Sequence, residues 1–106
     1  MNFTEEEKKA IVWTSKALAD CDGSRTVDEV RILANITGEI KFKISMSILD
    51  GINDMEPADV YALLRSLTME KKAYVKKKLE EVASIDGEMN HLEKNALFHI
   101  CYFGEL

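Results

Sequence analysis

The sequence has little cysteine, little proline and no long apolar run. Its 106 residues include two cysteines, Cys21 and Cys101, which are too few for a disulfide framework. A chain of this length buries a core without disulfides, so we expect a protein of the reducing cytoplasm. No apolar stretch approaches the ~20 residues of a membrane-spanning helix, and the acidic start "MNFTEEEKK" has no apolar core. Neither a transmembrane segment nor a secretory signal is therefore predicted.

Positive charge is also scarce. The chain carries 14 Lys and Arg against 19 Asp and Glu, which gives a net charge of −5. Because proteins bind nucleic acids largely through clustered Lys and Arg, this balance argues against a nucleic-acid partner and favours cations or basic partners. The sequence has no Gly-rich phosphate loop, nucleophile elbow or His-Glu metalloprotease pair, so no enzyme is predicted.

Helical patterns are abundant. With 46% hydrophobic and 31% charged residues and one proline, residues 1–106 are predicted to form a single all-α domain. Thr4 and Glu7 fit a capping box, in which each side chain accepts a hydrogen bond from the other's backbone N–H, and Thr68 also fits a cap. Pro57 suits the first position of a helix. The six predicted helices span residues 5–20, 27–38, 40–51, 57–67, 69–85 and 91–103.

Apolar residues at helical spacing define the predicted inner faces. The third helix, "IKFKISMSILDG", is apolar around most of its surface, so we expect it to be largely enclosed and to end at Asp50-Gly51. Gly38 is expected to end the second helix. The last two helices are expected to pack through Met69, Ala73, Val75, Leu79 and Val82, and through Leu92, Ala96, Leu97, Ile100 and Phe103.

One pattern occurs twice. Asp22-Gly23 followed by Glu29 matches Asp86-Gly87 followed by Glu93, 64 positions later. A helix often ends at Gly, which adopts the left-handed conformation without steric cost. A side chain three residues beyond each glycine then fits an N-cap, and each Glu completes a capping box. Helix end, short link and helix start therefore explain both copies without a ligand.

The same spacing also fits a calcium loop. In an EF-hand, five residues separate the glycine at position six from the glutamate at position twelve. Position one, which supplies a ligand in EF-hands, is Leu18 in the first copy and Val82 in the second. A true EF-hand is therefore not expected, but a weaker cation site built from convergent carboxylates remains open.

The two Asp-Gly turns, each followed by a Glu early in the next helix, resemble the TerB-like domain of tellurite-resistance proteins. A related domain occurs in the DnaJ co-chaperone DjlA. The resemblance covers nearly the whole chain and implies a compact helical bundle of about six helices with an internal pseudo-twofold repeat. It also implies that acidic residues gather on one side to hold a metal ion. Matched by position, these are Asp22 and Glu29 from the first repeat and Asp86 and Glu93 from the second.

The chain departs from the family pattern before each Asp-Gly, where Cys21 and Ile85 replace a small Ala. Asp20 adds a carboxylate beside the first turn and is included among the predicted metal ligands. Ca²⁺ or Mg²⁺ would suit such all-oxygen ligands. Cys21 with His91 offers softer ligands for zinc, although their spacing matches no recognised zinc motif.

We therefore predict a cytoplasmic TerB-like protein that binds or senses a divalent cation in a tellurite or chemical stress response, without an organic cofactor. The alternative is a metal-free protein-interaction module that acts through its helical surface or a Lys-rich face. That face comprises the lysines at 71, 72, 76, 77 and 78, which Glu80 and Glu81 partly neutralise. The oligomeric state is not predicted.

Overall fold

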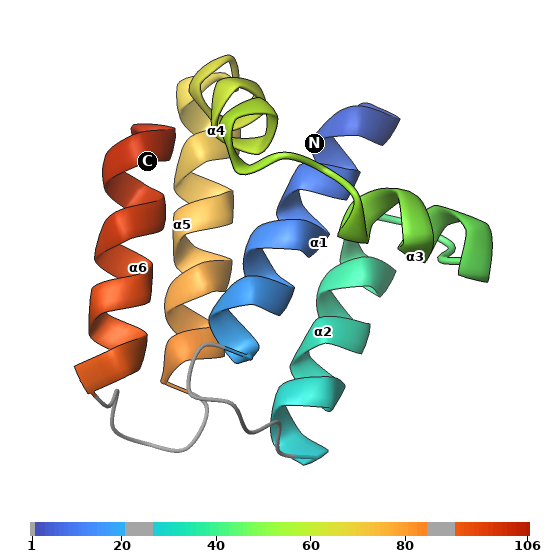
Figure 1. Ribbon diagram of the computed structural model, residues 1–106, viewed down its shortest axis with the longest axis horizontal. Coiled ribbons are helices and arrows are strands. Elements are labelled where there is room, and N and C mark those ends of the chain that lie inside the picture. The colour runs from blue at the N-terminus through green and yellow to red at the C-terminus, as the bar shows by residue number, and fades with distance from the viewer. Residues whose placement is uncertain (1, 21–26, 85–90) are drawn as a thin grey trace.

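The chain folds into six α-helices. The computed structural model describes residues 2–20, 27–84 and 91–106, without the side chains of residues 27–30 and 32 (Figure 1). No strand occurs within these ranges, which confirms the predicted all-α bundle. The helices are α1 (Glu5–Ala19), α2 (Val27–Glu39), α3 (Met46–Asn53), α4 (Pro57–Arg65), α5 (Met69–Ala83) and α6 (His91–Gly104).

The first helix, α1, is central to the bundle and packs against each of the other five helices. In Figure 1, α6, α5, α1 and α2 run alongside one another, α4 lies across one end, and α3 extends outward on the α2 side. The radius of gyration is 12.7 Å, close to the ~13 Å of a single domain of this length. The six helices therefore form one domain. Within the described residues, no helix is both long and apolar enough to cross a membrane.

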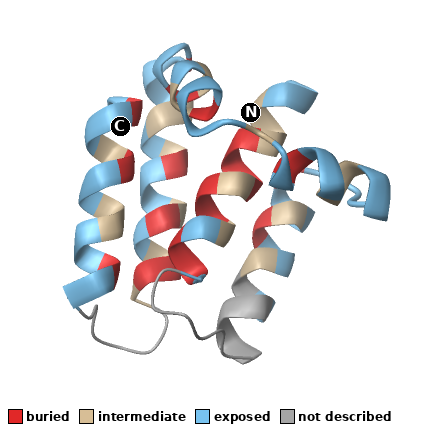
Figure 2. Ribbon diagram, viewed as in Figure 1, coloured by how far each residue is buried: buried red, intermediate tan, exposed pale blue. Residues whose placement is uncertain are grey.

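One hydrophobic core lies between the helices. In α5, Val75, Leu79 and Val82 are at most 1% exposed and recur at helical spacing. Figure 2 shows buried residues on the sides of α1, α5 and α6 that face one another. The other buried hydrophobic residues of this core are Ala10, Ile11, Leu18, Ala19, Ile36, Ile40, Val60, Leu64, Leu67, Ala83 and Ile100.

Three helices begin where the sequence predicted them, two of them at threonine caps and one at a proline. The Glu7 N–H donates to Thr4 Oγ1 at 3.1 Å, and the Thr4 N–H donates to Glu7 Oε1 at 2.7 Å, which confirms the capping box. Thr68 Oγ1 accepts a hydrogen bond from the Lys71 N–H at 3.3 Å at the start of α5. Pro57 begins α4, where its missing N–H is not needed. The hydrogen bonds of the two threonine caps satisfy N–H groups that have no partner inside the helix at its start.

The prediction for the end of α2 was wrong. The helix continues past Gly38 to Glu39, and Lys41 adopts a left-handed conformation with φ of 56°. The Phe42 N–H donates to the Thr37 carbonyl at 2.9 Å and the Lys41 N–H donates to the Gly38 carbonyl at 3.2 Å. These two bonds form a Schellman motif, whose left-handed position usually holds glycine. Because a lysine takes that position here, the nearby glycine misled the prediction.

The third predicted helix was wrong in its start, its end and its burial. It begins at Met46, because Ser45 Oγ accepts a hydrogen bond from the Ile48 N–H at 3.3 Å and so caps the helix there. It continues past Gly51 instead of ending there. Ile52 is its one fully buried residue, whereas Met46 is 74% exposed. Since α3 extends from the bundle and packs mainly on α1, much of its apolar surface faces outward.

Several residues predicted to lie in the core also face outward. Met69 is 83% exposed, Leu92 is 51% exposed and Phe103 is 45% exposed, and Ala73 is exposed as well. At 3.6 residues per turn, Met69 and Ala73 point roughly 120° or more away from the buried side of α5. Their hydrophobicity alone had suggested burial, but their position on the helix excludes it.

Candidate functional site

Four helix ends lie at the same end of the bundle. α1 and α5 end there, and α2 and α6 begin there (Figure 1). Each copy of the repeated Asp-Gly pattern joins one of the ending helices to one of the starting helices. Because helix N-termini expose N–H groups and carry partial positive charge, carboxylates are favoured at the starts of α2 and α6.

The structure describes the five predicted metal ligands to different extents. Asp22 and Asp86 lie outside the described residues. Glu29 is the third residue of α2, and its side chain lies outside the description, while Glu93 is the third residue of α6. Asp20 is the C-cap of α1, and its side chain is exposed. The three residues with a described backbone thus belong to helix ends that lie at the same end of the bundle.

Glu93 is the best-defined carboxylate of the set. It is only 7% exposed, and it has an interaction partner. Ala19 and Ala83, the last residues of α1 and α5, are also buried, and their small side chains allow close approach of the helix ends. Because a buried carboxylate is costly unless it is paired, the partner of Glu93 matters for stability as well as for ligand binding.

No metal-binding group of three or more His, Cys, Asp or Glu occurs within residues 2–20, 27–84 and 91–106. Asp22 and Asp86 are outside these ranges, so the carboxylate site stays a prediction. For the zinc alternative, Cys21 is also outside them. His91 is the exposed first residue of α6, and its Nε2 lies 3.2 Å from Nδ2 of Asn95.

Ion pairs within the protein hold some lysines of the predicted Lys-rich face of α5. Lys71 Nζ lies 2.9 Å from Glu7 Oε1, and Lys78 Nζ lies 2.8 Å from Glu39 Oε2 and 3.4 Å from Glu81 Oε2. The first two contacts join α5 to α1 and to α2. Two of the five lysines are therefore held within the protein, which favours a supporting role for this face over an anion-binding patch.

The contacts around Glu39 shift the pKa values of three groups. Hydrogen bonds from the Lys78 ammonium and from the Tyr74 hydroxyl lower the pKa of the Glu39 carboxyl, and Glu39 in turn raises the pKa of Lys78. Burial, together with the 2.9 Å hydrogen bond to Glu39, raises the pKa of Tyr74 to about 12. The three groups keep fixed protonation states near pH 7, so this cluster joins helices and does not exchange protons.

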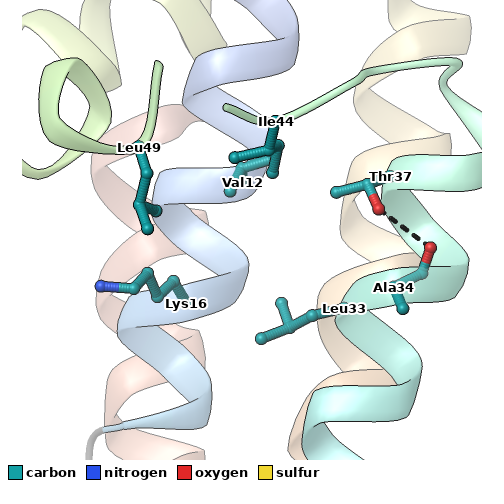
Figure 3. Close-up of a pocket in the computed structure, with 7 residues that line it drawn as sticks. All are labelled: Val12, Lys16, Leu33, Ala34, Thr37, Ile44 and Leu49. Carbon is teal, nitrogen blue, oxygen red and sulfur yellow. Dashed lines mark hydrogen bonds between the residues drawn. The ribbon is translucent and has the colours of Figure 1, made fainter. Parts of the chain in front are cut away.

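An apolar groove of about 270 Å³ lies between α1, α2 and the start of α3 (Figure 3). Figure 3 shows Val12 on α1 and Leu33 on α2 at its two sides. The Thr37 hydroxyl donates to the Ala34 carbonyl at 2.9 Å, so its polar atom is used by the backbone. Lys16 adds one ammonium at the groove, bonded to the side chain of Asn53 at 2.9 Å. The lining suits apolar groups and contains no pair of a nucleophile and a base.

The sequence analysis missed an aromatic face on α4 and α6. It consists of Tyr61, Phe98, His99, Tyr102 and Phe103. Ring centroids of Tyr61 and Phe103 are 5.8 Å apart, those of His99 and Phe103 are 4.6 Å apart, and Phe98 stacks on Tyr102 at 6.1 Å. The four-residue spacing of Phe98 and Tyr102, on the side of the helix opposite Ile100, was the signal that could have revealed this face.

The comparisons with known proteins support the fold. No protein-family model matches the sequence, and no curated protein matches it. The crystal structure of a protein of unknown function from Porphyromonas gingivalis W83 is similar over 100% of this chain and 87% of that chain, with a TM-score of 0.76 and 22% sequence identity. At that identity the similarity shows a shared all-helical fold.

Proposed function

We propose that the chain is a TerB-like protein that binds or senses a divalent cation, Ca²⁺ or Mg²⁺. The proposed oxygen donors are Asp22, Glu29, Asp86 and Glu93, with Asp20 beside them. The placement of the four helix ends at one end of the bundle carries the proposal, because both copies of the Asp-Gly pattern connect these ends. The connection to tellurite or chemical stress rests on the resemblance described above.

The chemistry of this donor set favours a hard cation. Neighbouring carboxylates repel one another, so a cluster of them either takes up protons or binds a cation. Ca²⁺ accepts six to eight oxygen ligands in variable geometry, whereas Mg²⁺ requires a regular octahedron and keeps several waters. A cation held by both repeats would connect the α1–α2 pair to the α5–α6 pair. Cation binding would then stabilise the folded protein in proportion to the free cation concentration, which is a means of sensing.

Calorimetric titration with Ca²⁺, Mg²⁺, Mn²⁺ and Zn²⁺ tests the proposal. We expect the wild-type protein to bind a divalent cation and the double variant Asp22→Asn/Asp86→Asn to lose that binding. The matched control is Asp54→Asn/Asp59→Asn, which removes the same charge from exposed residues before and within α4. If the control loses affinity as strongly as the first variant, general charge and not a site explains the binding.

A single substitution separates the ligand from the helix cap. Glu29→Gln keeps a side chain that can complete a capping box but replaces a charged oxygen donor with a weaker, neutral one. The cation proposal predicts reduced affinity with an unchanged melting temperature in the absence of cations. A lower melting temperature with unchanged affinity would instead show that the residue serves only as a cap.

The second candidate function is a metal-free protein-interaction module. The exposed aromatic face of α4 and α6 favours it, because large exposed apolar patches mark interaction sites. If the wild-type protein binds no cation at millimolar concentration, the cation proposal fails and this function remains.

A further inference from the structure

The apolar groove between α1, α2 and α3 exists because two helices share one support. Both α2 and α3 pack on α1, and the segment that connects them turns at the left-handed Lys41. The Ser45 cap then starts α3 at Met46, and the helix extends outward from the bundle (Figure 1). The side of α1 between the two helices is therefore only partly covered, and Val12 lies there with 5% of its surface exposed.

Most of the groove lining is aliphatic. Leu33 on α2 and Leu49 on α3 are half-buried, and Ile44, in the segment before α3, is 40% exposed. Figure 3 shows Ile44 beside Val12, and Leu33 directed from α2 toward α1. These side chains still contact water in the free protein. An apolar group placed between them would remove that surface from water, which favours binding.

One positive charge borders this apolar surface. Of the described residues that line the groove, Lys16 alone is charged. Its Nζ donates to Asn53 Oδ1 at 2.9 Å, which is a neutral acceptor, and Figure 3 shows Nζ on the side away from Leu33. An ammonium has three donors, so Asn53 leaves two for other acceptors. Asp20 and Lys16 both line the neighbouring pocket, but Asp20 does not line this groove.

The charge and the volume of the groove define its occupant. A carboxylate is complementary to the Lys16 ammonium, and a charge-assisted hydrogen bond is roughly twice as strong as a neutral one. The volume of about 270 Å³ lies just below the ~300–1,000 Å³ of sites for drug-sized ligands. A partner helix, which is ~10 Å across, is too large for this space. The complementary ligand is therefore a small molecule with one anionic end and an apolar body.

We propose that this groove binds a free aliphatic carboxylic acid of medium chain length. The carboxylate accepts a hydrogen bond from Lys16 Nζ beside Asn53, and the chain lies over Val12 between Leu33 and Leu49. A ligand in this position contacts α1, α2 and α3 together, so its binding stabilises the folded protein. The groove contains none of the proposed cation ligands, and the two proposals are independent.

Calorimetric titration of the full chain with butanoate, hexanoate and octanoate tests the site. We expect one ligand per chain and an affinity that rises about fourfold for each added methylene group. Octanol and octylammonium carry the same chain without the anion, and we expect octanoate to bind at least about tenfold more tightly than either. Equal binding of octylammonium, an affinity independent of chain length, or no saturable octanoate binding at about 1 mM overturns the proposal.

Two substitutions with matched controls locate the ligand. Lys16→Met keeps an unbranched apolar side chain, so it should weaken octanoate binding about tenfold and leave octanol binding unchanged. Its control is Lys76→Met, at an exposed lysine of α5. Ala34→Leu should fill the groove and abolish binding of both probes, whereas Asn35→Leu places the same side chain at the next exposed residue, outside the lining.

Circular dichroism of each variant confirms that the helical content is unchanged before its affinity is compared with that of the wild type. Unchanged octanoate affinity in Ala34→Leu shows that the ligand binds elsewhere and refutes the assignment. An equal loss of affinity in Lys16→Met and Lys76→Met does the same, because general charge then explains the attraction.

Discussion

Replacing Ser15 with alanine should stabilise the protein. Ser15 lies in α1 with no exposed surface, and its Oγ has no hydrogen-bond partner within the described part of the chain. A buried hydroxyl without a partner costs about 1–3 kcal/mol, and alanine also has a helix propensity better by a few tenths of a kcal/mol. The small space left by the oxygen offsets part of this gain. We therefore expect the free energy of unfolding to rise by about 1 kcal/mol, which corresponds to a rise in Tm of roughly 4–8 °C.

Thermal and urea unfolding followed by circular dichroism measures this change, and the neighbouring threonine is its control. Thr14 is equally buried, but its hydroxyl donates to the carbonyls of Ala10 and Ile11 at 3.0 Å each. Thr14→Val keeps the side-chain shape and removes these bonds, so it should be neutral or destabilising. If Ser15→Ala lowers the free energy of unfolding by more than about 0.5 kcal/mol, the hydroxyl is satisfied in solution and the reasoning is wrong.

Three further outcomes follow from local geometry. Gly104→Ala should destabilise the protein by about 1–3 kcal/mol in urea unfolding, because the added Cβ would lie 2.9 Å from Leu64 Cδ1. A Cβ added at Gly51 would meet nothing within 4 Å, so Gly51→Ala should instead be neutral or stabilising. Lys41→Gly should raise stability by about 1 kcal/mol, since glycine adopts the left-handed conformation without strain, and a decrease would contradict this. In an ultraviolet titration one tyrosine should ionise near pH 12 and be missing in Tyr74→Phe. Because folding raises that pKa, the stability it contributes is complete below the ordinary value of 10 and is lost as the pH rises through 12.

Helix starts were predictable because a capping side chain acts within one turn of its own helix. Thr4, Pro57 and Thr68 needed no information about the rest of the fold. The prediction for the segment before α3 was wrong because a turn and a cap within it could not be recognised from residue type alone. Its alternating apolar residues fit a helix by composition, but the left-handed Lys41 and the Ser45 cap interrupt it, and neither residue type demands that role.

Burial was less predictable, because it depends on which helices cover a given side. The stripe of Val75, Leu79 and Val82 was correct, since these residues share one side of α5. The four-residue spacing of Phe98 and Tyr102 indicates a second apolar side on α6, but which of its two apolar sides the other described helices cover is known only from the fold. For the same reason, the Asp-Gly pattern could suggest a set of carboxylate ligands but not that their helices end on the same side of the bundle. That information comes only from the packing of α1 against α5 and of α5 against α6.

The proposed cation ligand Glu93 and the exposed rings of α6 lie on opposite sides of the same helix. Glu93 lies on the side of α6 that also buries Ile100 and Gly104, whereas Phe98 and Tyr102 lie on the other side. Their side chains therefore do not compete for the same space. Substitution of the rings would therefore leave the proposed cation ligand Glu93 in place.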